Sequence, residues 1–204
     1  TNYFGQNIKD KRIVITGGTT GIGKAIADLL ITLGGRVLIF GRNHEDFKSA
    51  FDDIKQKFPD CELYGTTADV TKKEDVQKIM EIAENDLGGI DILINNAALL
   101  GPDIAQRDGN IELMDTDLWD RTYRINVRGT MIACREALPH LRASKGNIVN
   151  TVSSLALQGH LIQAAYSSSK AAIIQMTRAI AASHGKAGIR CNAVAPGMTM
   201  TSAL

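Results

Sequence analysis

A glycine-rich turn near the start of the chain restricts the fold more than any other feature. An apolar run at residues 13–15 leads into Thr-Gly-Gly-Thr-Thr-Gly-Ile-Gly at residues 16–23, and apolar residues then recur at helical spacing up to Leu33. The run indicates a buried strand and the spacing indicates a helix. Glycines in such a turn let the backbone approach a pyrophosphate, and the positive end of the helix dipole binds the anion. The alternative is a glycine-rich turn that binds no ligand.

Strand-like and helix-like segments alternate along the whole chain. We expect strands at residues 12–16, 36–40, 62–66, 91–94, 147–152 and 189–194, and helices at residues 21–33, 44–57, 72–87, 117–141 and 164–184. This alternation, with strands that are apolar on both faces, predicts an α/β fold with a doubly wound parallel sheet in three layers (α/β/α). The polar stretch at residues 99–114 is expected to be a loop, either at the rim of an active site or as a solvated connection.

Composition and charge limit the classes of function. The chain has 204 residues, enough for a single domain over residues 1–204, and a formal net charge of +1 gives no general attraction to nucleic acid or anionic membranes. We see no signal peptide and no apolar run that could span a bilayer, so we expect a cytoplasmic protein with neither nucleic acid nor membrane as partner. Cys61, Cys134 and Cys191 are widely spaced and are expected to be reduced thiols. No cluster has the spacing of metal ligands.

Tyr166 and Lys170 lie four residues apart in a segment with a helical pattern. On a helix this spacing places both side chains on one face, one turn apart. An ammonium beside a phenol favours the phenolate, so we expect Lys170 to lower the pKa of Tyr166 from about 10 and to make it a proton donor and acceptor near neutral pH. The same spacing is common on solvated helices, so the pair alone does not establish catalysis.

Six motifs in one order resemble the short-chain dehydrogenase/reductase family, and in particular its 3-oxoacyl-ACP reductase-like members. They are the glycine turn, Asp69-Val70, Asn95-Asn96-Ala97-Ala98, Asn126, the group of Ser153 with Tyr166 and Lys170, and Pro196-Gly197. The resemblance covers nearly the whole chain. It implies a Rossmann-type fold and hydride transfer between a nicotinamide cofactor and a carbonyl or secondary alcohol.

The resemblance implies a catalytic group of Asn126, Ser153, Tyr166 and Lys170. Tyr166 would exchange a proton with the substrate oxygen, and Ser153 would donate a hydrogen bond to the same oxygen. Lys170 would also hold the nicotinamide ribose. Asn126 would anchor a water that relays protons from Lys170 to solvent, or else bond a neighbouring backbone carbonyl. Ser153 is chosen over Ser154 because it lies thirteen residues before Tyr166, as in the family.

A larger set of residues is expected to bind the cofactor. They belong to the glycine turn, the ends of the strands, the catalytic helix and the last turn. The set comprises Gly17, Thr19, Thr20, Gly21, Ile22, Gly23, Arg42, Asn43, Asp69, Val70, Asn96, Ala97, Ala98, Tyr166, Lys170, Pro196, Gly197, Thr199 and Thr201. By resemblance, Asp69 and Val70 would contact adenine, and Thr199 and Thr201 would hold the nicotinamide carboxamide.

The end of the second strand bears on the choice between NADP(H) and NAD(H). Proteins of this kind that bind NAD carry an acidic residue there for the ribose hydroxyls. Here the strand is followed by Gly41-Arg42-Asn43, without a carboxylate. A guanidinium can bind a 2′-phosphate bidentately and stack on adenine, so NADP(H) is favoured. NAD(H) stays open, because no basic residue lies in the glycine turn and Arg42 could be solvated.

The chain departs from the family pattern at two places. Ala98 stands where the family usually has glycine, which is a strained replacement if the backbone needs a positive φ. The chain ends at Leu204, before the C-terminal segment that covers the substrate in the family, so it is either a fragment or an ordered subset. Two alternatives therefore stay open: an NAD-dependent alcohol or sugar dehydrogenase, and a non-catalytic dinucleotide-binding sensor or scaffold. The early end favours the second, and the intact catalytic group opposes it.

The substrate is expected to be a small carbonyl or alcohol compound, whose identity and direction of conversion the sequence leaves open. Residues between Ser153 and Tyr166 are expected to line its cleft, namely Leu155, Leu157, His160, Leu161 and Gln163. By resemblance, the two long helices would pair across a two-fold axis in a homodimer or homotetramer. Small and apolar side chains suit such packing or burial against the sheet equally, and they are Ala171, Ala172, Ile173 and Met176.

Overall fold

In the part of the chain that the computed structural model describes, residues 7–201, six parallel strands form one sheet. They are β1 (Arg12–Thr16), β2 (Arg36–Gly41), β3 (Leu63–Thr67), β4 (Ile92–Asn95), β5 (Asn147–Thr151) and β6 (Arg190–Val194). Their order across the sheet is β3-β2-β1-β4-β5-β6, with every pair parallel. This order confirms the doubly wound sheet. Residues 1–5, where no signal peptide is visible, and Leu204 lie outside the described residues.

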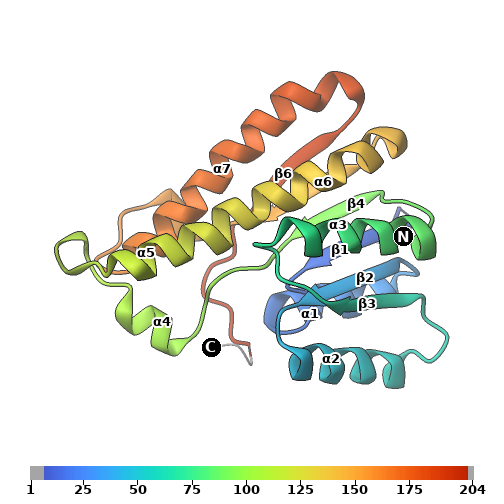
Figure 1. Cartoon of the computed structure of the whole chain (residues 1–204), viewed down its shortest axis with the longest axis horizontal. Helices are drawn as coiled ribbons and strands as arrows, with labels where there is room; N and C mark the ends of the chain where they lie inside the picture. Colours follow the sequence, from blue (N-terminus) through green and yellow to red (C-terminus); the bar gives the residue numbers. More distant parts are fainter. Residues whose placement is uncertain (1–6, 202–204) are drawn as a thin grey trace, which may run out of the picture.

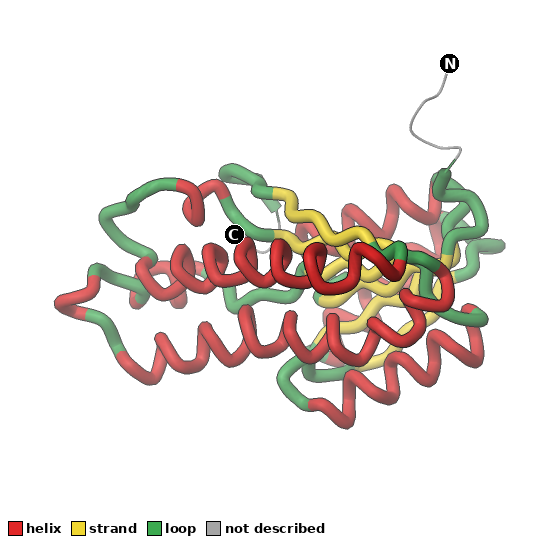
Figure 2. The backbone as a smooth tube through the Cα atoms, turned by 90° about the horizontal axis from the view of Figure 1, so that it is seen from above, coloured by secondary structure: helices red, strands yellow, loops and turns green. Residues whose placement is uncertain are grey.

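Helices cover both faces of this sheet. They are α1 (Gly21–Thr32), α2 (His44–Lys57), α3 (Lys73–Ile82), α4 (Pro102–Arg107), α5 (Thr116–Tyr123), α6 (Gly129–Ser144) and α7 (Ala164–His184). Helices α1 and α2 lie on one face, and α3, α6 and α7 lie on the other (Figure 1, Figure 2). Side chains of β1 alternate between the layers, since Ile13 and Ile15 pack with α1 and α2 whereas Val14 packs with α3 and α6. Within residues 7–201, no helix combines the length and hydrophobicity that crossing a membrane requires.

Two of the expected helices contain wider turns of the π type. The helix expected at residues 72–87 continues from α3 into the π-helical segment Ala83–Leu87, and the segment Arg124–Arg128 joins α5 to α6 within the helix expected at 117–141. A π segment inside a helix frequently marks a functional site. Here the irregular turn contains Asn126. The other expected elements begin and end within one residue of the observed ones.

The stretch at residues 99–114 is not the plain loop that its polar sequence predicts. It contains helix α4 and a 3-10 turn at Ile111–Leu113. Leu99 is 4% exposed and Asp108 is 2% exposed, and Leu99 packs with Leu118 in a small apolar cluster. The alternative of a purely solvated connection is therefore wrong, because side chains at the start and in the middle of the stretch are buried.

The three cysteines form no disulfide. Cys134 and Cys191 are buried, and Cys61 is partly buried. Burial raises the pKa of Cys134 to about 12 and that of Cys191 to about 11. Because the thiolate is the reactive form, these two thiols are inert at neutral pH.

Candidate active site

A cleft of about 560 Å³ opens along the carboxyl ends of the strands. Open α/β sheets bind ligands at this edge, where the strand order reverses, which here lies between β1 and β4. The expected site residues that line it are Gly17, Thr19, Thr20, Gly21, Ile22, Arg42, Asn43, Val70, Asn96, Ala97, Ala98, Ser153, Tyr166, Lys170, Pro196, Gly197, Thr199 and Thr201. Gly23, Asp69 and Asn126 do not line it. The fold thus gathers residues from segments far apart in the chain.

The glycine turn is held against the segment that follows β4. The Thr16 hydroxyl accepts hydrogen bonds from the amides of Asn96 and Ala97 at 3.1 and 3.0 Å. The Asn96 side chain donates to the Gly17 carbonyl at 3.0 Å. Gly17 has a φ of 64°, and a Cβ there would lie 2.8 Å from the Cα of Ala97. A Cβ on Gly23 would collide with the Gly17 carbonyl oxygen, so Gly23 permits close packing beneath the turn.

The amino end of α1 suits a bound phosphate. Its N-cap residue, Thr20, makes no capping hydrogen bond through its side chain, and the first turn contains no acidic residue. The N–H groups and the positive dipole end therefore face the cleft without a capping side chain, beside Gly21 and Ile22. These residues fit the pyrophosphate of a dinucleotide cofactor.

The end of β2 forms the part of the cleft where the sequence places the adenosine ribose. Arg42 is exposed and lines the cleft. The Asn43 side chain accepts hydrogen bonds from the amides of Glu45 and Asp46 at 2.8 and 3.2 Å, so it caps α2. Asp46 also lines the cleft. The strand-end pattern does not single it out, because it belongs to the first turn of α2.

The expected catalytic side chains Ser153, Tyr166 and Lys170 come together in the cleft. Lys170 is 2% exposed, and its ammonium donates to the Thr151 carbonyl at 2.7 Å. The same nitrogen lies 5.8 Å from the centroid of the Tyr166 ring. The Ser153 hydroxyl accepts from the Leu155 amide at 3.2 Å, and the Ser153 side chain lies near enough to Tyr166 to act on the pKa of the phenol. The three groups are therefore close enough to act on one substrate atom.

Burial controls the protonation of this group. It raises the pKa of Tyr166, and a hydrogen bond with the Ser153 side chain opposes the rise by a smaller amount. Burial also lowers the pKa of Lys170 to about 8. The expectation that Lys170 lowers the tyrosine pKa is therefore wrong for this chain by itself, because removal from water outweighs the other effects on the phenol.

Asn126 joins the segment after β4 to helix α7. It is completely buried, its side-chain oxygen accepts from the Leu99 amide at 2.8 Å, and its side-chain nitrogen donates to the Ser169 hydroxyl at 2.9 Å. Ser169 donates in turn to the Tyr166 carbonyl at 2.7 Å. These partners are an amide and a hydroxyl rather than the backbone carbonyl of the alternative interpretation. Asn126 thus supports the backbone of the expected proton donor from within the π-type turn.

Asp69 shapes a backbone turn, and the backbone at Ala98 is unstrained. The Asp69 carboxylate accepts from the Thr71 amide at 2.9 Å, and the Asp69 amide donates to the Asp75 carboxylate at 2.9 Å. This turn brings the neighbouring Val70 to the cleft. Ala98 does not have a positive φ, so alanine introduces no backbone strain there.

The cleft is lined partly by the residues expected between Ser153 and Tyr166. The lining residues expected from the sequence are Leu155, His160 and Gln163. Two other expected residues point elsewhere, since Leu157 and Leu161 lie outside the lining and are 68% and 90% exposed. Further lining residues are Leu100, Ile125 and Met198. Leu100 and Met198 come from connections whose sequence does not show where they fold back, and Ile125 comes from the π-helical segment between α5 and α6.

The sequence matches known proteins over nearly its whole length, in agreement with this geometry. A family model described as short chain dehydrogenase matches residues 11–204. The chain belongs to the short-chain dehydrogenase family. A probable short-chain type dehydrogenase/reductase of Bradyrhizobium diazoefficiens is 36% identical over 195 residues, which cover 95% of this chain and 68% of that protein.

Solved structures share the architecture of this short-chain dehydrogenase. Levodione reductase matches with a TM-score of 0.89 and 29% identity over 96% of this chain and 74% of that chain. A variant of actinorhodin polyketide ketoreductase, in a structure with NADPH, matches with a TM-score of 0.86 and 28% identity over 95% of this chain and 72% of that chain. As a member of this family, the protein is an NAD(P)-dependent oxidoreductase of small molecules, and such proteins are typically oligomeric.

A buried polar network supports the carboxyl ends of β4 and β5 in the short-chain dehydrogenase. The Asn95 side chain donates to the side-chain oxygen of Asn150 at 2.8 Å, and Asn150 donates to the Thr177 hydroxyl at 2.8 Å. Thr177 donates to the Ile173 carbonyl at 2.8 Å. The network therefore fixes both strands relative to the helix that carries the tyrosine and the lysine.

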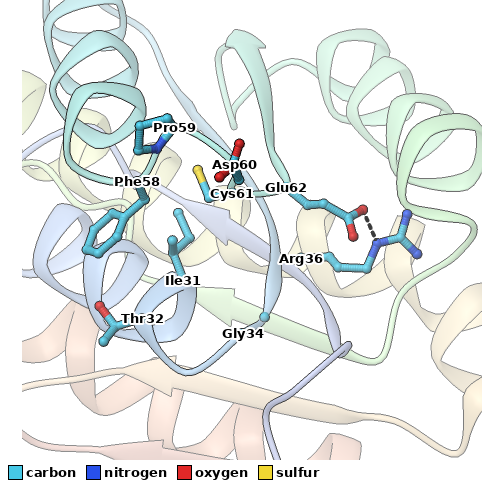
Figure 3. A pocket seen from close by; sticks show the side chains of 10 residues that line it. Ile31, Thr32, Gly34, Arg36, Phe58, Pro59, Asp60, Cys61 and Glu62 are labelled. Atoms are coloured by element: carbon cyan, nitrogen blue, oxygen red, sulfur yellow. Dashed lines mark hydrogen bonds and ion pairs between the residues drawn. The ribbon is translucent and has the colours of Figure 1, made fainter.

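A second hollow, of about 440 Å³, lies at the other edge of the sheet (Figure 3). Ile31 and Phe58 belong to the apolar core below it, and Arg36 forms an ion pair with Glu62 beside it. Because Arg36 begins β2, this hollow lies at the amino ends of the strands. None of the expected site residues lines it.

Proposed function

We propose that this protein transfers hydride between NADP(H) and a carbonyl or secondary alcohol, with Asn126, Ser153, Tyr166 and Lys170 as its catalytic group. The observation that carries the proposal is the meeting of the Ser153 and Tyr166 side chains beside the buried Lys170, in a cleft whose other end suits a dinucleotide. Two similar proteins are by name a reductase and a ketoreductase, and the second has a structure with NADPH. These similarities support reduction of a ketone.

Tyr166 and Ser153 act on the substrate oxygen in this proposal. The nicotinamide of the cofactor supplies hydride in reduction and accepts it in oxidation. Tyr166 gives its phenolic proton to the carbonyl oxygen, while the Ser153 hydroxyl donates a hydrogen bond to the same oxygen as negative charge develops there. Because burial raises the pKa of Tyr166, the phenol holds its proton at neutral pH and can act as an acid.

Lys170 and Asn126 support the proton donor. After proton transfer the Tyr166 oxygen is negative in a buried place, where a nearby ammonium stabilises it more than in water. The pKa of Lys170, about 8, leaves this group mostly protonated at neutral pH. Asn126 holds α7 and the segment after β4 together through Ser169 and Leu99. A relay water at Asn126 stays a prediction.

The substitution Tyr166→Phe tests this mechanism, because it removes the hydroxyl and keeps the ring. We expect NADPH to bind with nearly unchanged affinity while ketone reduction falls by about 100-fold or more, as the loss of a general acid implies. Levodione serves as the probe ketone, and NADPH oxidation is followed spectroscopically. Tyr123→Phe is the matched control, since Tyr123 stacks on Trp119 of the same helix and lies outside the cleft lining.

These binding and turnover measurements distinguish an enzyme from a non-catalytic dinucleotide-binding sensor. Undiminished turnover in Tyr166→Phe contradicts the mechanism. Tight NADPH binding by a native protein that converts no carbonyl or alcohol compound favours the dinucleotide-binding sensor or scaffold.

Arg42 and Asp46 favour different cofactors. A guanidinium suits the 2′-phosphate of NADP(H), whereas a carboxylate suits the ribose hydroxyls of NAD(H). β2 ends without an acidic residue, and Arg42 directly follows it in the cleft lining, so we propose NADP(H). The presence of Asp46 in the cleft lining is the observation that favours the alternative, an NAD-dependent alcohol or sugar dehydrogenase.

Separate titrations with NADPH and NADH, followed by nicotinamide fluorescence at one salt concentration, test the cofactor choice. We expect Arg42→Ala to weaken NADPH binding by roughly 10- to 100-fold, the worth of one charge-assisted contact, and to change NADH binding much less. Arg142→Ala, at an exposed arginine of α6, is the control. Equal losses for both cofactors would remove Arg42 from cofactor choice. A selective loss of NADH binding in Asp46→Ala would favour the NAD alternative.

We further propose a homodimer or homotetramer in which α6 and α7 of two protomers pack together. These helices run side by side along one face of the molecule (Figure 1, Figure 2). Ala171 is exposed and Ala172 partly exposed, whereas Ile173 is 1% exposed and packs inside its own chain. Fewer of the small and apolar side chains on α7 are therefore available for packing between protomers than the sequence suggests. Light scattering after size exclusion tests the assembly, and a mass near the 22.0 kDa of one chain would contradict it.

A further inference from the structure

Helix α7 begins without a cap from its own N-cap residue. The first N–H groups of a helix have no partner within the helix, and the side chain of the N-cap residue commonly accepts from the second or third of them. Here the N-cap residue is Gln163, which has a left-handed backbone with φ of 63° and makes no capping bond through its side chain. The third residue of this first turn is Tyr166. The way in which α7 is capped therefore bears directly on the proposed proton donor.

Asp108 supplies the cap from a distant part of the chain. One oxygen of its carboxylate accepts a hydrogen bond from the Ala165 amide at 2.9 Å, and the other accepts from the Tyr166 amide at 2.8 Å. These are the second and third residues of the helix, the same two that an ordinary N-cap side chain serves. The sequence separation of 57 residues between Asp108 and Ala165 means that only the tertiary fold makes this contact.

The backbone of the same segment completes the cap. The Asp108 carbonyl accepts from the Gln163 amide at 2.6 Å, and the Gly109 carbonyl accepts from the Ala164 amide at 3.3 Å. All four amides at residues 163–166 are thus satisfied by two neighbouring residues. The start of α7 is consequently tied to one point of the stretch at residues 99–114.

Asp108 is held firmly in this position. It is 2% exposed, and a buried carboxylate needs strong compensation, which two charge-assisted hydrogen bonds and the positive end of the α7 dipole provide. The segment before it is anchored at the Leu99 amide, which donates to Asn126, and at Ile104 of α4, which packs on the small apolar cluster around Leu99. Both anchors connect the stretch to the helices around the cleft.

We propose that Asp108 is a positioning residue for catalysis, whose carboxylate caps α7 from another segment and holds Tyr166 by its own amide. The inference rests on the proposed function, in which Tyr166 donates the proton. Helix ends open more readily than helix interiors, and Tyr166 lies in the first turn whereas Lys170 lies one turn further in. Without the cap, the first turn would open while Lys170 stays in place. The Tyr166 hydroxyl would then lose its position opposite Ser153.

Amide hydrogen exchange tests the contact without relying on activity. Asp108→Asn keeps the shape of the side chain but replaces one acceptor oxygen by a donor, which cannot bond a backbone N–H. We expect the Ala165 and Tyr166 amides of the native protein to exchange at least about tenfold more slowly than uncapped first-turn amides, and to lose this protection in Asp108→Asn. Unprotected amides in the native protein, or unchanged protection in the variant, would overturn the proposal.

Kinetics test the consequence for catalysis. With NADPH and levodione, we expect Asp108→Asn to lower kcat by roughly 10- to 100-fold, as small misplacements of reacting groups do, while the Kd for NADPH stays within about twofold. A residue that only stabilised the fold would lower the apparent kcat and the amount of NADPH bound together, both in proportion to the folded fraction. Asp103→Asn, at an exposed carboxylate of α4, is the control and should change neither quantity. A normal kcat in Asp108→Asn would overturn the positioning role.

The two proposals fail in different ways. Retained turnover in Tyr166→Phe rejects the proposed function. An inactive Tyr166→Phe together with a normal kcat in Asp108→Asn rejects only the positioning role. If levodione is not converted, or if Asp108→Asn does not fold, exchange at the Ala165 and Tyr166 amides of the native protein still decides, since unprotected amides overturn the contact.

Discussion

Replacing Lys170 by methionine should stabilise the protein while it abolishes activity. Lys170 is 2% exposed, and burial lowers its pKa from 10.5 to about 8. At about 1.4 kcal/mol for each tenfold change in the proton equilibrium, this drop means that the folded state holds the ammonium at a cost of about 3 kcal/mol at neutral pH. Methionine follows the lysine stem and carries no charge. The substitution also leaves the Thr151 carbonyl without its hydrogen-bond donor, which costs about 1 kcal/mol. We therefore expect the free energy of unfolding to rise by about 2 kcal/mol in total.

The gain should shrink as the pH rises. Below about pH 8 both the folded and unfolded states bind the Lys170 proton, so the full cost is present. Above that pH the folded state releases the proton while the unfolded state keeps it up to 10.5. Because the unfolded state then binds more protons, the unfolding free energy of the native protein rises with pH. We expect the difference between Lys170→Met and the native protein to fall by about 1 kcal/mol between about pH 7 and about pH 9.

Urea unfolding of both proteins at the two pH values measures this difference. Raised cysteine and tyrosine pKa values also make stability depend on pH, but they are common to both proteins and cancel in the comparison. Lys78→Met on the exposed side of α3 is the control, and its effect should be small and constant with pH. A Lys170→Met protein that is less stable than the native one at neutral pH, or a difference that does not change with pH, would refute the reasoning.

Two further substitutions test how the cleft is supported. Gly23→Ala places a methyl group against the Gly17 carbonyl oxygen, so we expect a loss of about 2–4 kcal/mol in urea unfolding and weaker NADPH binding; unchanged binding would show that the turn can open without harm. Asn150→Ala removes the central member of the network with Asn95 and Thr177 and leaves buried polar atoms unpaired. We expect it to lower the unfolding free energy by about 2–4 kcal/mol, and a loss below about 1 kcal/mol would mean that water replaces the side chain.

Much of the fold could be predicted because its signals are local. Each strand is a short apolar run between turn residues, and each helix repeats apolar residues at its own period, so most element boundaries agree with the structure to within one residue. The stretch at residues 99–114 was the exception. Its polar residues resemble a solvated loop, yet Asp108 is buried because α7 begins next to it and needs a cap.

The residues of the candidate site also divide into those that could be predicted from the sequence and those that could not. Tyr166 and Lys170 could be paired from their spacing, because a helix places residues four apart on one face. Ser153 could be chosen through the resemblance to the family, in which the serine lies thirteen residues before the tyrosine. Thr16 and Asp46 could not, since their roles depend on the segment after β4 and on the wall of the cleft, which come from elsewhere in the chain.

The sequence by itself determined the order of strands and helices along the chain and the glycine turn. It could do so because backbone periodicity and turn chemistry act over a few neighbouring residues. Only the tertiary structure decided that burial raises the pKa of Tyr166 and lowers the pKa of Lys170. It also decided that Asp108 caps the helix that carries these two residues. Desolvation and hydrogen bonding act through space, so they depend on which distant segments exclude water from a group and which bring it a partner.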